Sequence, residues 1–151
     1  MNLLAAMMML FATACTPGDE PITPSTTALG DIVLTVGDRS FTARLEQNST
    51  AEAFCALLPM TLEMTDLHRN EKYHYLSRPL PTNRTDVGTI HAGDIMLYGD
   101  DCVVVFYETF TTSYSYSRIG RIADPAGLKE ALGSGNVSVT FATAPAPVPT
   151  P

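Results

Sequence analysis

Apolar and polar residues alternate along several short stretches of this chain, as they do in strands that bury one face. In residues 31–36, Ile32, Leu34 and Val36 occupy every second position. A turn at Gly37-Asp38 leads to a second strand with one apolar face, and further strands are predicted at residues 60–65, 72–76, 89–90, 94–98, 102–107 and 136–141. Gly99-Asp100-Asp101 is a turn signal, so residues 94–107 are expected to form a hairpin.

Two short helices are predicted between the strands. Ser49-Thr50-Ala51-Glu52 is a capping box, because the Ser hydroxyl and the Glu carboxylate each satisfy a free backbone N–H at a helix start. Apolar residues follow at helical spacing until Pro59 ends this helix. Asp124-Pro125 is an N-cap followed by proline at the first helical position, so a second helix is expected over residues 126–132, before Gly133.

About eight strands with two helices of this size favour a closed β-barrel, capped by the helices, over a sandwich. The chain has no internal repeat. Residues 77–87, which include Pro79 and Pro81, are expected to form a long irregular loop. Loops of this length in a compact domain are often functional.

The two ends of the chain differ in composition from the domain expected at residues 31–141. The apolar run before Cys15 is shorter than the ~20 residues that cross a bilayer, but it suits a signal peptide over residues 1–15. Small residues just before Cys15 resemble a bacterial lipoprotein signal, whose cysteine becomes lipidated; an ordinary cleaved signal or a misassigned start are the alternatives. Residues 16–30 and 142–151 are predicted to be a disordered tether and tail.

The chain has 9 basic and 16 acidic side chains, for a net charge of −7. An acidic domain repels phosphate backbones, so nucleic acid is not an expected partner. Binding to anionic lipid through a basic patch is disfavoured for the same reason. Membrane attachment is therefore expected only through a lipid on Cys15, which predicts a protein of the bacterial cell envelope, either lipid-anchored or secreted.

Four motifs stand in order along the chain: LLPMTL at residues 57–62, GDIMLYG at 93–99, YSYSRIGRI at 114–122 and LGSGNV at 132–137. Together they resemble the bacterial cyclophilin-like domains that occur as small single-domain proteins. The similarity covers about residues 31–141. It implies a closed eight-stranded cyclophilin-like β-barrel with a short helix capping each end.

The resemblance does not extend to the catalytic residue. Cyclophilins isomerise Xaa-Pro bonds with an arginine that hydrogen-bonds the prolyl nitrogen beside a hydrophobic pocket, against an intrinsic barrier of ~18–20 kcal/mol. In those enzymes the arginine lies on the strand that follows the first helix. Here that strand, residues 60–65, contains no arginine. No catalytic residue is therefore carried over.

The candidate ligand-binding residues are Phe110, Tyr114, Tyr116 and Arg118. The last three fall at even spacing, so on a strand they would share one face, which Phe110 joins if the chain stays extended. Phenol and guanidinium groups can stack against and hydrogen-bond a peptide or a flat ligand. The alternative is an outer barrel face with ordinary cross-strand pairs. Arg121 has the opposite parity and is expected to point elsewhere.

Cys55 and Cys102 could form a disulfide in an oxidising compartment, or could pack as free thiols in the core. The three histidines are too far apart along the chain to share a metal, and no ligand spacing typical of a metal site occurs. We expect neither a metal nor a cofactor. The sequence thus predicts an exported, non-catalytic module that binds a peptide or small ligand; the alternative is a prolyl isomerase that uses Arg118 or Arg121, with Phe106 or Phe110 in its proline pocket.

Overall fold

The computed structural model describes residues 28–145. The predicted signal with Cys15, most of the tether and most of the tail lie outside the described residues. None of the helices in this described range is long and apolar enough to cross a membrane.

Strands dominate the described part of the chain, and two short helices interrupt them. The elements follow in the order β1 (Asp31–Val36), β2 (Arg39–Leu45), α2 (Ser49–Cys55), β3 (Met60–Leu67), β4 (Glu71–Tyr75), β5 (Arg84–Asp86), β6 (Thr89–Ile90), β7 (Asp94–Tyr98), β8 (Cys102–Phe106), β9 (Phe110–Thr111), β10 (Ser115–Ile122), α3 (Leu128–Leu132) and β11 (Val137–Thr143).

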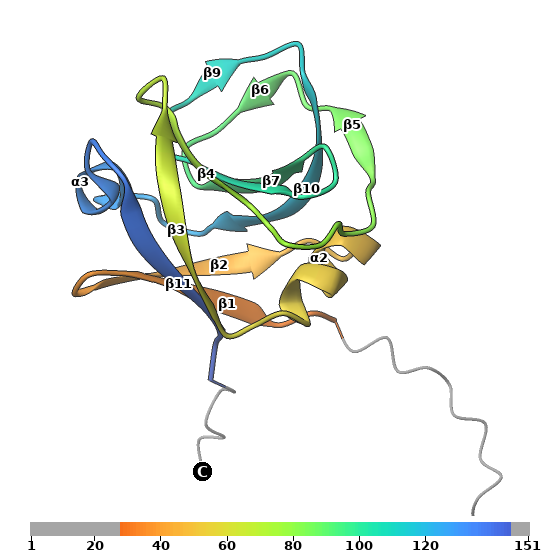
Figure 1. Ribbon diagram of the computed structural model, residues 1–151, viewed down its shortest axis with the longest axis horizontal. Helices are drawn as coiled ribbons and strands as arrows, with labels where there is room; N and C mark the ends of the chain where they lie inside the picture. The colour runs from red at the N-terminus through yellow and green to blue at the C-terminus, as the bar shows by residue number, and fades with distance from the viewer. Residues whose placement is uncertain (1–27, 146–151) are drawn as a thin grey trace, which may run out of the picture.

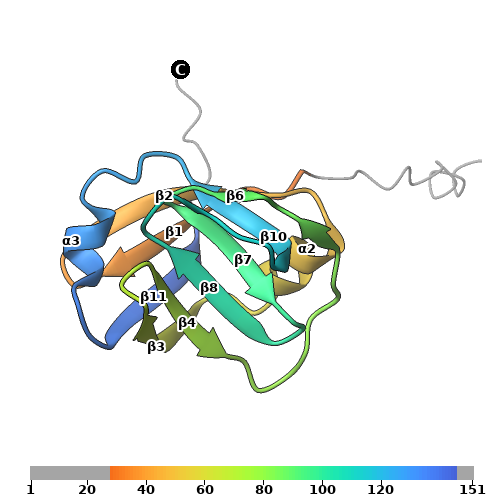
Figure 2. The ribbon, with the colours of Figure 1, turned by 90° about the horizontal axis from the view of Figure 1, so that it is seen from above.

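Eight of these strands close into an antiparallel barrel. Neighbours follow the order β2, β1, β11, β3, β4, β8, β7 and β10, and pairing of β10 with β2 closes the ring. Figures 1 and 2 show this ring from two sides, with α2 and α3 at its opposite ends. The predicted eight-stranded barrel with two short helices is confirmed.

The inside of the barrel is the main hydrophobic core. Alternating residues of β1 and β2, including Ile32, Leu34 and Ala43, are fully buried there. Phe54 of α2 packs edge to face on Phe141 of β11, with ring centroids 5.5 Å apart. One apolar face per strand therefore fills the barrel, as the alternation predicted.

A second hydrophobic cluster lies on the outer wall of the barrel. It contains Ile90, Met96, Cys102, Val104, Phe106 and Tyr116. The cluster explains why β8 is apolar at every position, since Val103 and Val105 face the barrel interior while their neighbours face this outer cluster. The two-stranded β6–β9 sheet stands off the wall on this side (Figure 1).

Three local predictions are wrong. The side chain that caps α2 is Asn48 rather than Ser49: its oxygen accepts from the N–H of Ala51 at 2.8 Å, while its amide donates to the Arg118 carbonyl at 3.0 Å. The Ser49 hydroxyl instead accepts a hydrogen bond from the side-chain amide of Asn83 at 2.9 Å. The second helix begins at Leu128 rather than 126, because Gly127 adopts a left-handed conformation with φ 81°.

The third correction concerns residues 77–87. They contain β5, which pairs with the first half of β10, and Ser115 donates a hydrogen bond to Asp86 across this pair. All three residues of β5 are exposed and polar. Local sequence gave no strand signal because this pairing depends on a partner about 30 residues away.

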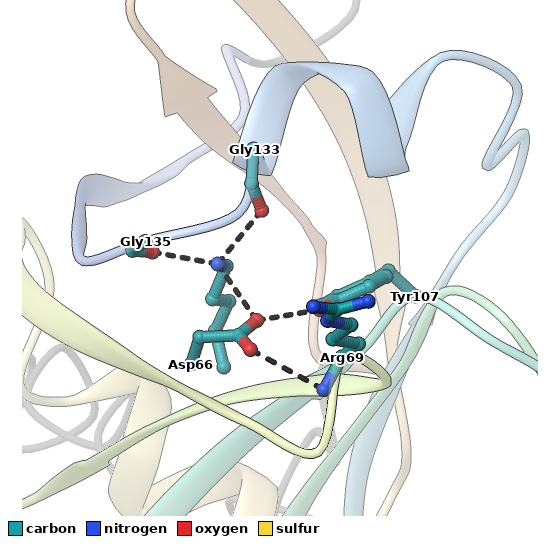
Figure 3. A network of polar contacts seen from close by, with 6 residues as sticks. Asp66, Arg69, Tyr107, Gly133 and Gly135 are labelled. Atoms are coloured by element: carbon teal, nitrogen blue, oxygen red, sulfur yellow. Dashed lines mark hydrogen bonds and ion pairs between the residues drawn. The ribbon is translucent and has the colours of Figure 1, made fainter.

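A buried lysine joins strands of the barrel wall to the segment that follows α3, through acceptors that include Asp66, Gly133 and Gly135 (Figure 3). Lys72 is fully buried, and its Nζ donates to Asp66 Oδ1 at 2.9 Å and to the carbonyls of Gly133 and Gly135 at 2.9 and 2.7 Å. Tyr107 also donates its hydroxyl to Asp66. Every Lys72 proton thus has an acceptor, and β3, β4 and the segment after α3 are held together.

Candidate ligand-binding site

A hollow of about 540 Å³ lies against the outer wall, over β4, β7, β8 and β10. We call it the aromatic hollow; its walls are Leu67, His68, Asn70, Glu71, Tyr73, Tyr75, Tyr98, Cys102, Val104, Phe110, Thr111, Thr112, Ser113, Tyr114 and Tyr116. Its size is typical of pockets that hold small organic ligands.

The strand register places these side chains side by side. Glu71, Tyr73 and Tyr75 occupy every second position of β4, opposite Phe106, Val104 and Cys102 of β8. Cys102 in turn pairs with Tyr98 of β7. Because alternate residues of a strand face the same side, one face of the sheet collects apolar and aromatic groups from three strands.

Aromatic rings contact one another across the hollow. Tyr98 lies 5.6 Å from Tyr116 and 6.0 Å from Tyr114 between ring centroids. Phe106 packs on Tyr116 and Phe110 at 5.5 and 5.8 Å. Tyr116 is buried, whereas Tyr75, Tyr98 and Tyr114 are 61%, 45% and 61% exposed. The hollow therefore has a packed floor and a mouth of accessible tyrosines.

Two oxygen acceptors of the hollow have no donor. Asn70 Oδ1 is buried without a hydrogen-bond partner. The half-buried carboxyl of Glu71 receives no hydrogen bond and no ion pair from the part of the chain that the structure describes. Buried acceptors normally have partners, so Asn70 Oδ1 is an exception to that rule, whereas the Glu71 carboxyl remains open to the hollow.

The ionisation of the hollow follows from its burial. Burial raises the pKa of Glu71 to about 7, and the nearby charge of Asp66 adds to the effect. Burial raises the pKa of Tyr116 to about 12 and that of Cys102 to about 11, in both cases with a contribution from Glu71. Cys102 is therefore a protonated thiol at neutral pH and a poor nucleophile.

A strained turn borders the hollow. His68 and Arg69, between β3 and β4, have φ values of 54° and 59°, and the N–H of Asn70 donates to the Leu67 carbonyl at 3.2 Å. Two left-handed residues in succession define a type I′ turn, which favours Asn and Gly. Strain in non-glycine residues is concentrated at functional sites in proteins, and His68 itself lines the hollow.

The structure brings together three of the four residues expected to bind a ligand. Phe110, Tyr114 and Tyr116 all line the aromatic hollow. Arg118 lines a separate hollow, which we call the arginine hollow and which is formed by Arg44, Leu45, Glu46, Gln47, Arg118, Arg121, Ile122 and Ala123. The expected set is therefore divided between two surfaces.

A β-bulge changes the expected direction of Arg121. Arg118 pairs with Met96 and Gly120 with Ile95, so Ile119 is an extra residue in β10. An extra residue reverses the alternation after it, and Arg121 returns to the face of Arg118. The parity prediction for Arg121 is therefore wrong, since both arginines line the arginine hollow.

Two arginines of this second hollow have carboxylate partners. Arg121 Nε donates to Asp94 Oδ1 at 2.6 Å, and Asp94 is almost fully buried. Arg44 Nε lies 3.8 Å from Asp31, in a pair that is largely exposed. These partners reduce the positive potential that the hollow presents to a ligand.

Sequence reasoning did not include Glu71, Tyr73, Tyr75 and Tyr98 in the site. The sequence contained part of the evidence for these residues, since Glu71, Tyr73 and Tyr75 fall at every second position, the spacing that places side chains on one face of a strand. What the sequence did not supply was the pairing of β4 with β8, which turns this face towards Tyr116.

Cys55 and Cys102 are both free thiols in the structure. Cys55 packs against the core inside the barrel, whereas Cys102 belongs to the outer cluster. The two cysteines thus occupy the second of the two arrangements considered from the sequence. Within residues 28–145, no three His, Cys, Asp or Glu side chains come together as a metal site requires.

The closed antiparallel barrel, with a second hydrophobic cluster on its outer wall, places this chain among small β-barrel proteins. The profile of the Cyclophilin-like family matches residues 34–142. The chain therefore belongs to the cyclophilin-like family, as the four motifs indicated. No curated protein sequence matches this chain.

Two solved structures share the fold. The hypothetical protein AF2241 from Archaeoglobus fulgidus, solved in solution, is 16% identical, with a TM-score of 0.52, and the match covers 78% of this chain and 96% of that one. McbB, solved in complex with tryptophan, is also 16% identical, with a TM-score of 0.58. That match covers 79% of this chain and 46% of McbB.

Proposed function

We propose that this protein is a binding module that holds a small organic ligand, or one side chain of a peptide, in the aromatic hollow without catalysing a reaction. The observation that carries the proposal is the hollow itself, which has aromatic walls from several strands and the unpaired carboxyl of Glu71 in its lining. Concave, mostly apolar sites with a few polar groups are the usual form of ligand pockets.

The chemistry of the walls favours binding over catalysis. The thiol of Cys102 stays protonated at neutral pH because its pKa is raised to about 11. Among the described residues that line the hollow there is no lysine or arginine to stabilise a developing negative charge. Binding by stacking and hydrogen bonding needs neither group.

The alternative, a prolyl isomerase that uses Arg118 or Arg121, would need an arginine and a proline pocket facing the same bond. Arg118 and Arg121 line the arginine hollow, whereas Phe110 lines the aromatic hollow. The separation of these groups argues against a shared substrate.

The McbB neighbour holds tryptophan, which makes indole compounds reasonable first probes for this chain. We therefore propose a titration of the ¹⁵N-labelled full chain with L-tryptophan and with a short Xaa-Pro peptide, followed by amide shifts. A binding module would show saturable shifts around β4, β7 and β10 with at least one probe, while Xaa-Pro exchange stays at its uncatalysed rate. Faster exchange that Arg118→Ala abolishes would overturn the proposal in favour of an isomerase.

We further propose that the protein is exported and anchored through a lipid on Cys15. The support comes from the sequence: the short apolar run and the small residues that precede Cys15. Metabolic labelling with a radioactive fatty acid in a bacterial host should label the wild type and not Cys15→Ser. Equal labelling of both proteins would contradict the lipid anchor.

A further inference from the structure

Asn70 and Glu71 are consecutive residues, and both line the same hollow. Asn70 Oδ1 is buried with no donor. The Glu71 carboxyl also receives no donor or cation from the described residues, although Lys72 is its neighbour in sequence. The Lys72 side chain lies on the other face of β4, where three acceptors already occupy it. Because Asn70 Oδ1 is also closed to solvent, Glu71 is the unpaired acceptor that a ligand in the hollow can reach.

The walls around these acceptors suit a positive charge. Tyr73, Tyr75, Tyr98, Tyr114 and Tyr116 all line the hollow. The face of an aromatic ring attracts a cation through its quadrupole. The net charge of −7 also favours the approach of a cation over that of an anion.

We propose that the aromatic hollow binds a protonated amine attached to a flat apolar body, with Glu71 as the counter-ion and the tyrosines around the apolar body. This inference rests on the proposed binding function and names its ligand class. An ammonium group carries three N–H donors and a positive charge, so it can both hydrogen-bond and neutralise the Glu71 carboxylate. A neutral ligand of the same shape would leave the Glu71 charge unpaired, and an anionic ligand would be repelled by it.

The binding should depend on pH because the counter-ion titrates near neutrality. The titratable groups on the same side as Glu71 are Cys102 of β8 and Tyr116 of β10, with His68 on the adjoining turn, while the charge of Asp66 acts on Glu71 from the other face of the sheet. Cys102 and Tyr116 stay protonated well above neutral pH. Affinity for an amine should therefore rise between pH 6 and 8 as Glu71 ionises, and Glu71→Gln should remove this rise.

Three probes with the same indole ring test the inference: tryptamine is a cation, tryptophol is neutral and indole-3-propionate is an anion. Each is titrated at pH 8 into the ¹⁵N-labelled full chain, into Glu71→Gln and into Glu130→Gln. The last variant is a control, because Glu130 is an exposed residue of α3 outside the hollow, and its substitution changes the net charge by the same amount.

We expect tryptamine to bind at least tenfold more tightly than tryptophol, with indole-3-propionate the weakest. Glu71→Gln should weaken tryptamine about tenfold and leave tryptophol unchanged, while Glu130→Gln behaves as the wild type. If tryptophol or the anion binds as well as tryptamine, the amine inference is wrong and the proposed binding function stands. If none of the three shifts any resonance of the hollow, both fail for ligands of this size.

Discussion

The carboxyl of Glu71 keeps its proton to a higher pH in the folded protein than in the unfolded chain. Its pKa is raised to about 7 in the fold, first by burial and then by Asp66, from an ordinary value of 4.5. Between these two values the folded protein keeps a proton that the unfolded chain has lost. The stability linked to this proton is complete below about pH 4.5 and is lost as the pH rises through about 7.

Replacing Glu71 by Gln should therefore stabilise the protein at pH 8 more than at pH 4.5. A pKa shift of this size corresponds to a difference of ~3 kcal/mol in the free energy of unfolding if solvent screening is ignored. Screening of a half-exposed carboxyl lowers the expected gain to about 1–2 kcal/mol. Urea unfolding of wild type, Glu71→Gln and the control Glu130→Gln at both pH values measures it. An equal effect of Glu71→Gln at pH 4.5 and pH 8 would contradict the raised pKa.

Lys72 is a fully buried cation, and hydrogen bonds to its three acceptors, Asp66, Gly133 and Gly135, stabilise its charge (Figure 3). Burial by itself would raise the pKa of Asp66, but hydrogen bonds from Tyr107 and Lys72 and the charge of Lys72 outweigh it, so this pKa is lowered. The stability that Asp66 contributes is therefore present above its unfolded pKa and is lost as the pH falls through the folded value.

Lys72→Met should keep the volume of the side chain while leaving Asp66 and two glycine carbonyls without a donor. We expect a loss of about 3 kcal/mol in the free energy of unfolding, because one partner of a buried ion pair is removed. Lys129→Met is the matched control: Lys129 is exposed and pairs with the partly exposed Glu108, so the unfolding midpoint of this variant should hardly change. Similar midpoints for the two variants would show that the Lys72 network contributes little.

The β3–β4 turn is the element in which local conformation and residue type disagree most. Arg69 is exposed and has φ 59°, a conformation that costs about 1–2 kcal/mol for a residue with a side chain. Arg69→Gly should remove this strain, and after the higher entropy of glycine in the unfolded chain is subtracted, the protein should gain roughly 0.5–1 kcal/mol.

Thermal unfolding compares Arg69→Gly with Arg78→Gly. Arg78 is also exposed but does not have a positive φ, so glycine there should slightly lower the unfolding temperature. Opposite changes in the two variants support the strained turn. A decrease in both would mean that the side chain of Arg69 contributes more than its backbone costs.

At the scale of elements, the sequence predicted what depends on local pattern. Residues 31–36 alternate because one face fills the barrel, and their strand was found within its observed bounds. Strand β5 was missed because its exposed Arg-Thr-Asp sequence becomes a strand only beside β10. The bulge at Ile119 was missed for a similar reason, since a register against β7 is not visible in β10 alone. For the same reason, the sequence did not show that Arg118 lines a different hollow from Phe110, Tyr114 and Tyr116.

The whole barrel closes where β10 meets β2, and this contact depends on Gly120. A Cβ at Gly120 would lie 2.5 Å from the carbonyl oxygen of Arg44, well inside any real contact distance. The bulge therefore needs a residue without a side chain at the seam. Backbone of both strands would have to move to accept any other residue.

Gly120→Ala should lower the stability by about 2–3 kcal/mol through this overlap. The control is Gly135→Ala, where no atom lies within 4 Å of the added methyl group. Chemical denaturation of both variants measures the difference, and amide resonances of β2 and β10 report whether the seam opens. A Gly120→Ala protein as stable as the control would place the closure of the barrel elsewhere.

The gathering of tyrosines also gives the molecule an optical property. The chain has six tyrosines and no tryptophan, and five of the six line the aromatic hollow. Its near-ultraviolet circular dichroism and its intrinsic emission therefore originate largely from one surface. A transparent ligand that enters the hollow would change both signals without any label, so occupancy can be followed in the unmodified protein at micromolar concentrations.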